Sequence, residues 1–177
     1  MGEAPKFTFG KLFIAVLCRP DVDVETLLTD LALVYGPVKQ PTRFFSFAHT
    51  AYYEPEMGPD LRRFFVVIEA LYDPSQLAET KLNSTALEKK YADGQGRRVN
   101  LDPGMLFLHN LILLSTKNFA HRIPLSQGIY AEVTLIYQNK KWVSLPWTFP
   151  DYQTEGYHAL FHEIRHDYQI QLLRPQR

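Results

Sequence analysis

The segment Lys11–Arg19 (KLFIAVLCR) carries an unbroken apolar run between two basic residues. A run of this length, bounded by polar residues, predicts a strand that is buried on both faces. Apolar residues then recur at helical spacing between a cap at Asp21 or Asp23 and a stop at Gly36-Pro37. The chain therefore begins with a buried strand followed by an amphipathic helix.

The same reasoning extends over the next sixty residues. Arg43–Tyr53 and Leu61–Tyr72 are rich in aromatic and β-branched residues, as strands are, and the acidic EPEMGPD between them predicts the tip of a long hairpin. A helix is expected from Asp73 to Tyr91, and Arg97–Leu101 predicts another short strand. This order, βαββαβ, is that of the ferredoxin-like motif.

The second half of the chain has a different sequence pattern from the first. Asp102-Pro103-Gly104 predicts a turn, and Met105–Thr116 is compatible with a buried strand or a short helix. An antiparallel meander and a C-terminal helix follow, at His121–Leu125, Ile129–Tyr137, Lys141–Leu145 and Tyr157–Leu172. We expect one α+β domain over residues 1–177, with a mixed, largely antiparallel sheet and two or three helices on one face. Its halves, 11–102 and 105–177, should share one core.

Charge and composition exclude several classes of protein and of site. The 177 residues include 19 basic and 19 acidic side chains, so the chain lacks the net positive field of a dedicated nucleic-acid binder. Cys18 is the single cysteine, which rules out an internal disulfide and a cysteine-based zinc site. No apolar run approaches the ~20 residues that span a bilayer. We expect a cytoplasmic protein without a membrane partner.

The segment His162-Glu163-Ile164-Arg165-His166 matches H-E-x-x-H, which on a helix can hold a zinc ion. A catalytic zinc needs a third protein ligand. The nearest upstream histidine, His158, is ~12 Å of helix rise from His166, so both cannot bind one ion. We therefore disfavour His162 and His166 as metal ligands and expect them at the edge of an apolar stripe.

Two groups of polar residues, one at the hairpin tip and one at a strand end, are candidate ligands. Glu54 and Glu56 lie beside Tyr53 at the tip and could hold a hard cation such as Mg²⁺, although a solvated turn is the commoner explanation. Arg97 and Asp102 flank the next predicted strand. An arginine fork suits a phosphate or carboxylate, and a surface ion pair is the alternative.

A third group surrounds the meander. Lys117, His121 and Arg122 place three cationic or titratable groups just before a strand, where they could cradle an anion. Glu132 interrupts an apolar strand, which is costly unless a salt bridge to Arg122 or Lys117 pairs it, or unless it has a catalytic or metal-binding role. Asp151 belongs to an aromatic, proline-rich loop that either lines a pocket or closes the end of the core.

Five phrases in this order, YYEPEMG, RRVNLDPG, TKNFAHRI, GIYAEVTL and LPWTFPDY, resemble a family of bacterial proteins, domain of unknown function 4416. The resemblance covers roughly Lys11 to Leu173. Some members carry a GTP-binding label, but this sequence has no Walker phosphate loop. The phrases that carry the resemblance are turns and strand ends, where polar residues more often serve a site than packing.

These observations together suggest an enzyme that acts on a small phosphorylated or otherwise anionic substrate, with a nucleotide among the candidates and a divalent cation such as Mg²⁺ as a cofactor. We expect metal binding or base catalysis from Glu54, Glu56 and Glu132, and proton transfer from His121. Substrate binding is expected from Tyr53, Arg97, Asp102, Lys117, Arg122 and Asp151. The alternative is a non-catalytic ligand-sensing or protein-interaction module, which predicts an exposed apolar patch.

Overall fold

A seven-stranded antiparallel sheet forms the centre of the computed structural model, which describes residues 6–47, 52–94 and 96–173. Its strands are β1 (Lys11–Cys18), β2 (Arg62–Val67), β3 (Val99–Leu106), β4 (Asn110–Ser115), β5 (Ile123–Pro124), β6 (Tyr130–Gln138) and β7 (Lys141–Ser144). They follow the order β2-β1-β3-β4-β6-β5, and β7 also pairs with β6. Together with the helices, this sheet confirms the α+β class.

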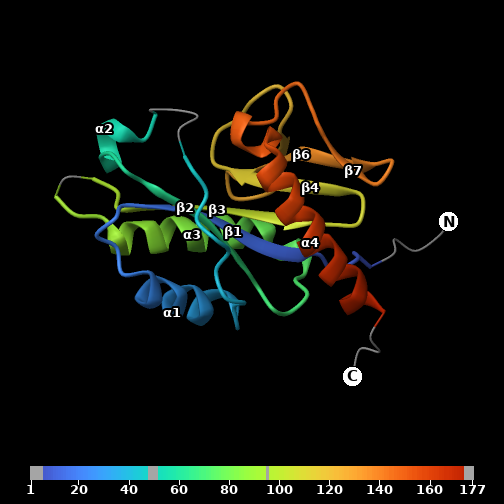
Figure 1. Cartoon of the computed structure of the whole chain (residues 1–177), viewed down its shortest axis with the longest axis horizontal. Helices are drawn as coiled ribbons and strands as arrows, with labels where there is room; N and C mark the ends of the chain where they lie inside the picture. Colours follow the sequence, from blue (N-terminus) through green and yellow to red (C-terminus); the bar gives the residue numbers. More distant parts are fainter. Residues whose placement is uncertain (1–5, 48–51, 95, 174–177) are drawn as a thin grey trace.

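Helices cover both faces of the sheet (Figure 1). They are α1 (Val24–Tyr35), α2 (Glu54–Met57), α3 (Leu77–Tyr91) and α4 (Glu155–Leu172), with short 3₁₀ turns η1 (Pro74–Gln76) and η2 (Pro150–Gln153). α1 and α3 pack on one face, while α4 and η2 pack on the other. All helices were expected on one face, but β1 is buried on both, and a strand of this kind needs cover on each side.

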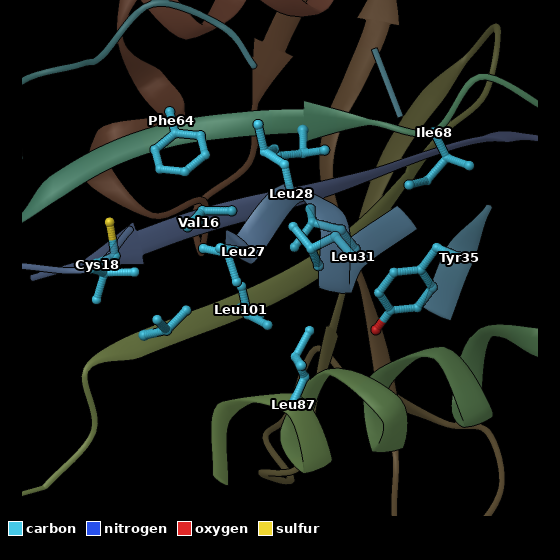
Figure 2. Close-up of a cluster of buried hydrophobic side chains, with 14 of the residues drawn as sticks. Val16, Cys18, Leu27, Leu28, Leu31, Tyr35, Phe64, Ile68, Leu87 and Leu101 are labelled. Atoms are coloured by element: carbon cyan, nitrogen blue, oxygen red, sulfur yellow. The ribbon is translucent and has the colours of Figure 1, made fainter. Parts of the chain in front are cut away.

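The α1–α3 side holds an aliphatic core (Figure 2). Val16 and Cys18 of β1 meet Leu27 and Leu31 of α1 there, and Leu87 of α3 closes the layer. Each of these side chains is at most 8% exposed. Fully burying one such side chain contributes ~1.5–3 kcal/mol.

The α4 side is mainly aromatic. Phe65 of β2 packs edge-on against Tyr157 of α4, with ring centroids 4.9 Å apart, and Phe13 of β1 lies 5.2 Å from Phe161. Thr154 caps α4 by accepting a hydrogen bond from the Tyr157 amide. The C-terminal helix is therefore fixed at its start, and its apolar stripe faces the sheet as predicted.

The strand predicted at Arg43–Tyr53 does not form as a regular strand. The amides of Lys39, Thr42 and Phe45 donate to carbonyls of β2 that are two residues apart, so three residues of this segment span two of its partner. That mismatch bulges the chain, and regular pairing is lost. Residues 48–51 lie outside the described residues, and α2 occupies the predicted hairpin tip. β1 nevertheless lies between β2 and β3, as in the ferredoxin-like arrangement.

The turn predicted at Asp102-Pro103-Gly104 is wrong, because β3 continues through it to Leu106. The Pro103 nitrogen faces away from β1 by strand alternation, and the β3–β4 pairing ends at Gly104↔Leu113, one residue before Pro103, so the pairing with β1 is kept. Gly104 serves close packing: a Cβ atom on it would lie 2.3 Å from Cζ of Phe13. Both residues that signal a turn are thus accommodated within a strand.

The remaining elements follow the prediction closely. The ambiguous Met105–Thr116 segment contains the end of β3, a short turn and β4, and the turn at Asn139-Lys140 has positive φ at both residues. β5 is shorter than predicted and spans two residues. Among the described residues, no helix is both long and apolar enough to cross a bilayer.

Candidate functional site

A buried acid lies at the centre of the first polar group, which we call the acid–base cluster (Ser115, Lys117, His121, Arg122 and Glu132). The Glu132 side chain is 2% exposed, and its Oε2 accepts from Nε of Arg122 at 2.7 Å. The same Oε2 lies 3.0 Å from Nε2 of His121. Arg122 also donates to Oγ of Ser115 and to the Lys117 carbonyl, which ties the loop before β5 to the sheet.

Local structure explains the position of Glu132. Glu132 pairs with Leu113 of β4, and Leu113 pairs with Gly104 of β3. Paired residues point to the same face of a sheet, so the Glu132 side chain lies on the face covered by α4. Oε1 is 3.4 Å from the Thr134 hydroxyl. The expected salt bridge to Arg122 is present, and it offsets the cost of burying the carboxylate.

The His121 ring is held on three sides. Trp147 stacks on it with centroids 5.1 Å apart and an interplanar angle of 7°, and Phe119 packs against it at 5.3 Å. Because a carboxylate only accepts, Glu132 fixes the proton of the neutral ring on Nε2. Nδ1 then presents its lone pair, and no described residue donates to it. This arrangement can accept a proton from a bound molecule.

The second group gathers around the start of β3, and we call it the arginine–carboxylate cluster (Tyr53, Glu56, Arg97, Asn100 and Asp102). Arg97 binds both carboxylate oxygens of Glu56, at 2.7 and 2.6 Å, and donates to Oδ1 of Asn100 at 2.8 Å. Asn100 in turn donates to Oδ2 of Asp102 at 2.7 Å. Burial, with the nearby charge of Asp102, raises the pKa of Tyr53 to about 12.

Two side chains from α3 connect this cluster to the open edge of β3. Lys81 donates to the Leu101 carbonyl at 3.0 Å and to Oδ1 of Asp102 at 3.1 Å, while Glu88 accepts from the Leu101 amide at 2.6 Å. Burial alone would raise the pKa of Asp102, but the charges of Lys81 and Arg63 hold it below its ordinary value. Burial raises the pKa of Glu88 despite the opposing charge of Lys81.

The two groups are connected through Tyr52: Nζ of Lys117 donates to the Tyr52 hydroxyl at 3.2 Å, and the Tyr52 ring packs against that of Tyr53. Asp102 of β3 and Glu132 of β6 are two strand spacings apart, or ~10 Å across the sheet, whereas Arg63 of β2 is four spacings, or ~19 Å, from Glu132. One small ligand therefore cannot contact both Arg63 and Glu132. Glu54 is exposed on α2, and its carboxylate contacts neither group in the part of the chain that is described.

A buried arginine was missed in the sequence. Arg63 is 3% exposed, and its side chain lies on the face of β2 that α4 covers, with the Phe47 ring 4.6 Å away. Nearby, Tyr152 and Tyr157 are buried to a similar degree, and Asp151 is 8% exposed. The strand alternation of LRRFFVV carries the signal, because Arg63 shares a face with Phe65 and Val67.

The histidines of the H-E-x-x-H segment lie on the exposed side of α4. Nδ1 of His162 is 3.4 Å from the Tyr137 hydroxyl, and His166 is exposed. Among the residues that the structure describes, no group of three or more histidine, cysteine, aspartate or glutamate side chains is arranged to hold a metal ion.

Two surface cavities, of about 370 and 140 Å³, open between α4 and the segment before α2. Arg43, Phe45 and Gly156 line the larger one, and Lys11 and Lys39 line the smaller one. Neither is lined by one of the candidate ligand or catalytic residues, although Glu163 of the H-E-x-x-H segment lines both.

Comparison with protein families gives one match. The family model of a domain of unknown function, DUF4416, matches residues 8–168. The chain belongs to this family. No curated protein and no solved structure matches it. Membership in DUF4416 confirms the resemblance carried by the five phrases, and it assigns no activity.

Proposed function

We propose that this DUF4416 protein is an enzyme that moves a proton on a small anionic substrate bound beside His121. The observation that carries the proposal is the buried Glu132 carboxylate, which lies 3.0 Å from Nε2 of His121 and leaves Nδ1 without a described partner. A histidine oriented by a carboxylate is a common general base, because the acid fixes the tautomer and stabilises the imidazolium that forms.

Lys117 is the group we assign to the substrate's anionic part. It is exposed, and its described hydrogen-bond partner is a neutral hydroxyl, so its charge is available to a ligand. Arg122 is already engaged by Glu132, Ser115 and a carbonyl. We therefore regard Arg122 as a positioning residue that holds Glu132, and Trp147 as the wall against which His121 is fixed.

A thermal-shift screen tests the proposal. The panel contains nucleotides, sugar phosphates and small carboxylates, each with and without magnesium. A compound that stabilises the wild type should stabilise Lys117→Met less, and NMR of the incubated compound should show turnover that His121→Gln abolishes. His166→Gln is the matched control, because it changes an exposed histidine of α4. Binding and turnover that are equal in all four proteins would refute the assignment.

A second candidate is a protein-interaction module. Phe119, Ile123, Leu125 and Phe149 are 42–65% exposed, and they come from the loops on either side of His121 and Trp147. Exposed apolar groups of this kind mark interfaces. This candidate predicts that Phe119→Ser reduces self-association in analytical ultracentrifugation, whereas the enzyme proposal predicts no change.

A further inference from the structure

Three buried polar groups near the start of α4 have no hydrogen-bond partner among the described residues. They are Nε of Arg63 and the hydroxyls of Tyr152 and Tyr157. The three side chains are 3%, 4% and 2% exposed, respectively. An unsatisfied buried donor is destabilising, and more so when it is charged, so three in one place need a cause.

The sheet register explains why they meet. Arg63 and Phe65 are two residues apart on β2 and point to the same face. The Phe65 ring lies 4.9 Å from that of Tyr157 and 6.3 Å from that of Tyr152. The two tyrosine rings are 5.3 Å apart. Both tyrosines therefore pack on the strand residue that follows Arg63 on this face.

The acceptors around Arg63 are already engaged. Oδ1 of Asp102 accepts from Lys81, and Oδ2 accepts from Asn100. The described residues offer no hydrogen-bond acceptor to the guanidinium, whose described contact is the Phe47 ring. Arginine has five N–H donors and stays charged, and Asp102 and Asp151 interact with that charge electrostatically, so what is lacking here is an acceptor within hydrogen-bond distance.

We propose that Arg63, Tyr152 and Tyr157 form a buried binding site for one oxyanion group, a carboxylate or a phosphate. Arg63 supplies the charge and a fork of donors, and the two hydroxyls donate to the remaining oxygens. The site is separate from the acid–base cluster, because four strand spacings lie between Arg63 and Glu132. It is therefore independent of the function proposed for His121.

The larger surface cavity lies beside this site. Its wall includes Phe45, whose ring lies 5.0 Å from that of Tyr157, and Gly156, which precedes Tyr157 in the chain. Arg43 is exposed at the same cavity, with its guanidinium 5.2 Å from the Phe45 ring. A cation at the mouth attracts an anion, and rotation of one aromatic ring would admit a small one.

Isothermal titration and thermal shift on the full chain test the proposal, with sodium phosphate and sodium acetate as probes and sodium chloride at matched ionic strength. One of the two oxyanions should raise the Tm of the wild type by roughly 5–10 °C at 100 times its Kd. Tyr157→Phe should weaken that anion about tenfold, because it removes one charge-assisted hydrogen bond. Arg63→Met should abolish the shift. The two arms distinguish a carboxylate site from a phosphate site.

Tyr35→Phe is the matched control, because the Tyr35 hydroxyl is buried but donates to the Thr80 carbonyl at 3.0 Å. It should lower the Tm without anion and leave the anion shift intact, whereas Tyr157→Phe without anion should keep the wild-type Tm. Should Arg63→Met not fold, Tyr152→Phe replaces it, with the same expected weakening as Tyr157→Phe. His121→Gln should retain the full anion shift, which separates this site from the proposed enzyme.

Two results would overturn the proposal. The first is an equal anion shift in the wild type, Tyr157→Phe and Arg63→Met, which would reflect general salt stabilisation. The second is the absence of any shift beyond chloride, with Tyr157→Phe losing as much Tm as Tyr35→Phe. That result would mean that ordered water satisfies these groups.

Discussion

Gly104→Ala is the substitution whose effect the structure fixes most tightly. Gly104 lies inside β3, and a Cβ atom there would be 2.3 Å from Cζ of Phe13, 2.8 Å from Cδ2 of Leu113 and 2.8 Å from the carbonyl oxygen of Ile112. The first two atoms belong to side chains that are fully or almost fully buried. The third belongs to the β3–β4 pairing and cannot withdraw without breaking it.

The magnitude follows from these contacts. Adding a methyl group to a packed core costs ~1–3 kcal/mol, and we expect the upper end because a backbone atom is one of the three obstacles. Alanine also reduces the conformational entropy of the unfolded chain, which raises the free energy of unfolding by ~0.4–1 kcal/mol where the backbone conformation is allowed. A net loss of about 2 kcal/mol should lower the Tm of a chain of this length by roughly 4–8 °C.

Urea unfolding and differential scanning calorimetry measure this loss. Gly94→Ala is the matched control, because a Cβ atom there meets nothing within 4 Å, and it should raise the Tm by roughly 1–4 °C through the same restriction of the unfolded chain. Phe13→Leu removes the nearest ring atom and should recover part of the loss in the double variant, giving a measurable coupling energy. A Gly104→Ala protein within 1 °C of the wild type would refute the packing argument for this position.

Three further predictions concern charges. Burial lowers the pKa of Lys11 to about 8, so between that pH and ~10.4 the unfolded state binds more protons than the folded state. The free energy of unfolding should therefore rise by about 2 kcal/mol from pH 7 to 9.5. Urea titrations at each pH measure this rise, and Lys11→Met should lack it. Glu132→Gln leaves the buried Arg122 without its counter-charge and should cost about 3 kcal/mol in urea unfolding, whereas a loss below 1 kcal/mol would contradict the buried ion pair. Glu56→Gln breaks the exposed bidentate pair with Arg97 and should cost less than ~1 kcal/mol by calorimetry, with a smaller loss in 1 M salt.

The sequence predicted most of the secondary structure because the hydrophobic patterns of β1, α1, β6 and α4 are long and regular. The turn predicted at Asp102-Pro103-Gly104 was wrong for a reason that the periodicity of the sequence does not reveal. Proline and glycine signal a turn when the chain is considered locally, but here Pro103 keeps its pairing with β1 at the point where the β3–β4 pairing ends, and Gly104 lies under the Phe13 ring. Both explanations depend on neighbouring strands, so they are tertiary effects.

The irregular edge at Lys39–Phe45 shows the same limit. Aromatic and β-branched residues favour a strand there, and the segment does run beside β2. The spacing of its hydrogen bonds, three residues against two, is set by the partner strand. No local pattern reports such a mismatch.

The arginines chosen from the sequence and the one that was missed differ in their hydrogen-bond partners. Arg97 and Arg122, two of the candidate ligands chosen from the sequence, are already engaged by carboxylates. The missed residue, Arg63, is the one whose guanidinium finds no described acceptor, and it lies within a strand rather than at a turn. A search that favours turns and strand ends, where function is common, passes over a charged residue on a buried strand face.

That difference gives a general criterion for this fold. A buried charge that is paired, such as Glu132, can be accounted for by the stability of its ion pair alone. A functional role for Glu132 must therefore rest on its neighbours, here the oriented His121. A buried donor without an acceptor costs free energy. The charge of Arg63 is compensated electrostatically by Asp102 and Asp151, but its Nε has no acceptor and lies beside two unpaired hydroxyls, so binding of an oxyanion would satisfy all three donors at once.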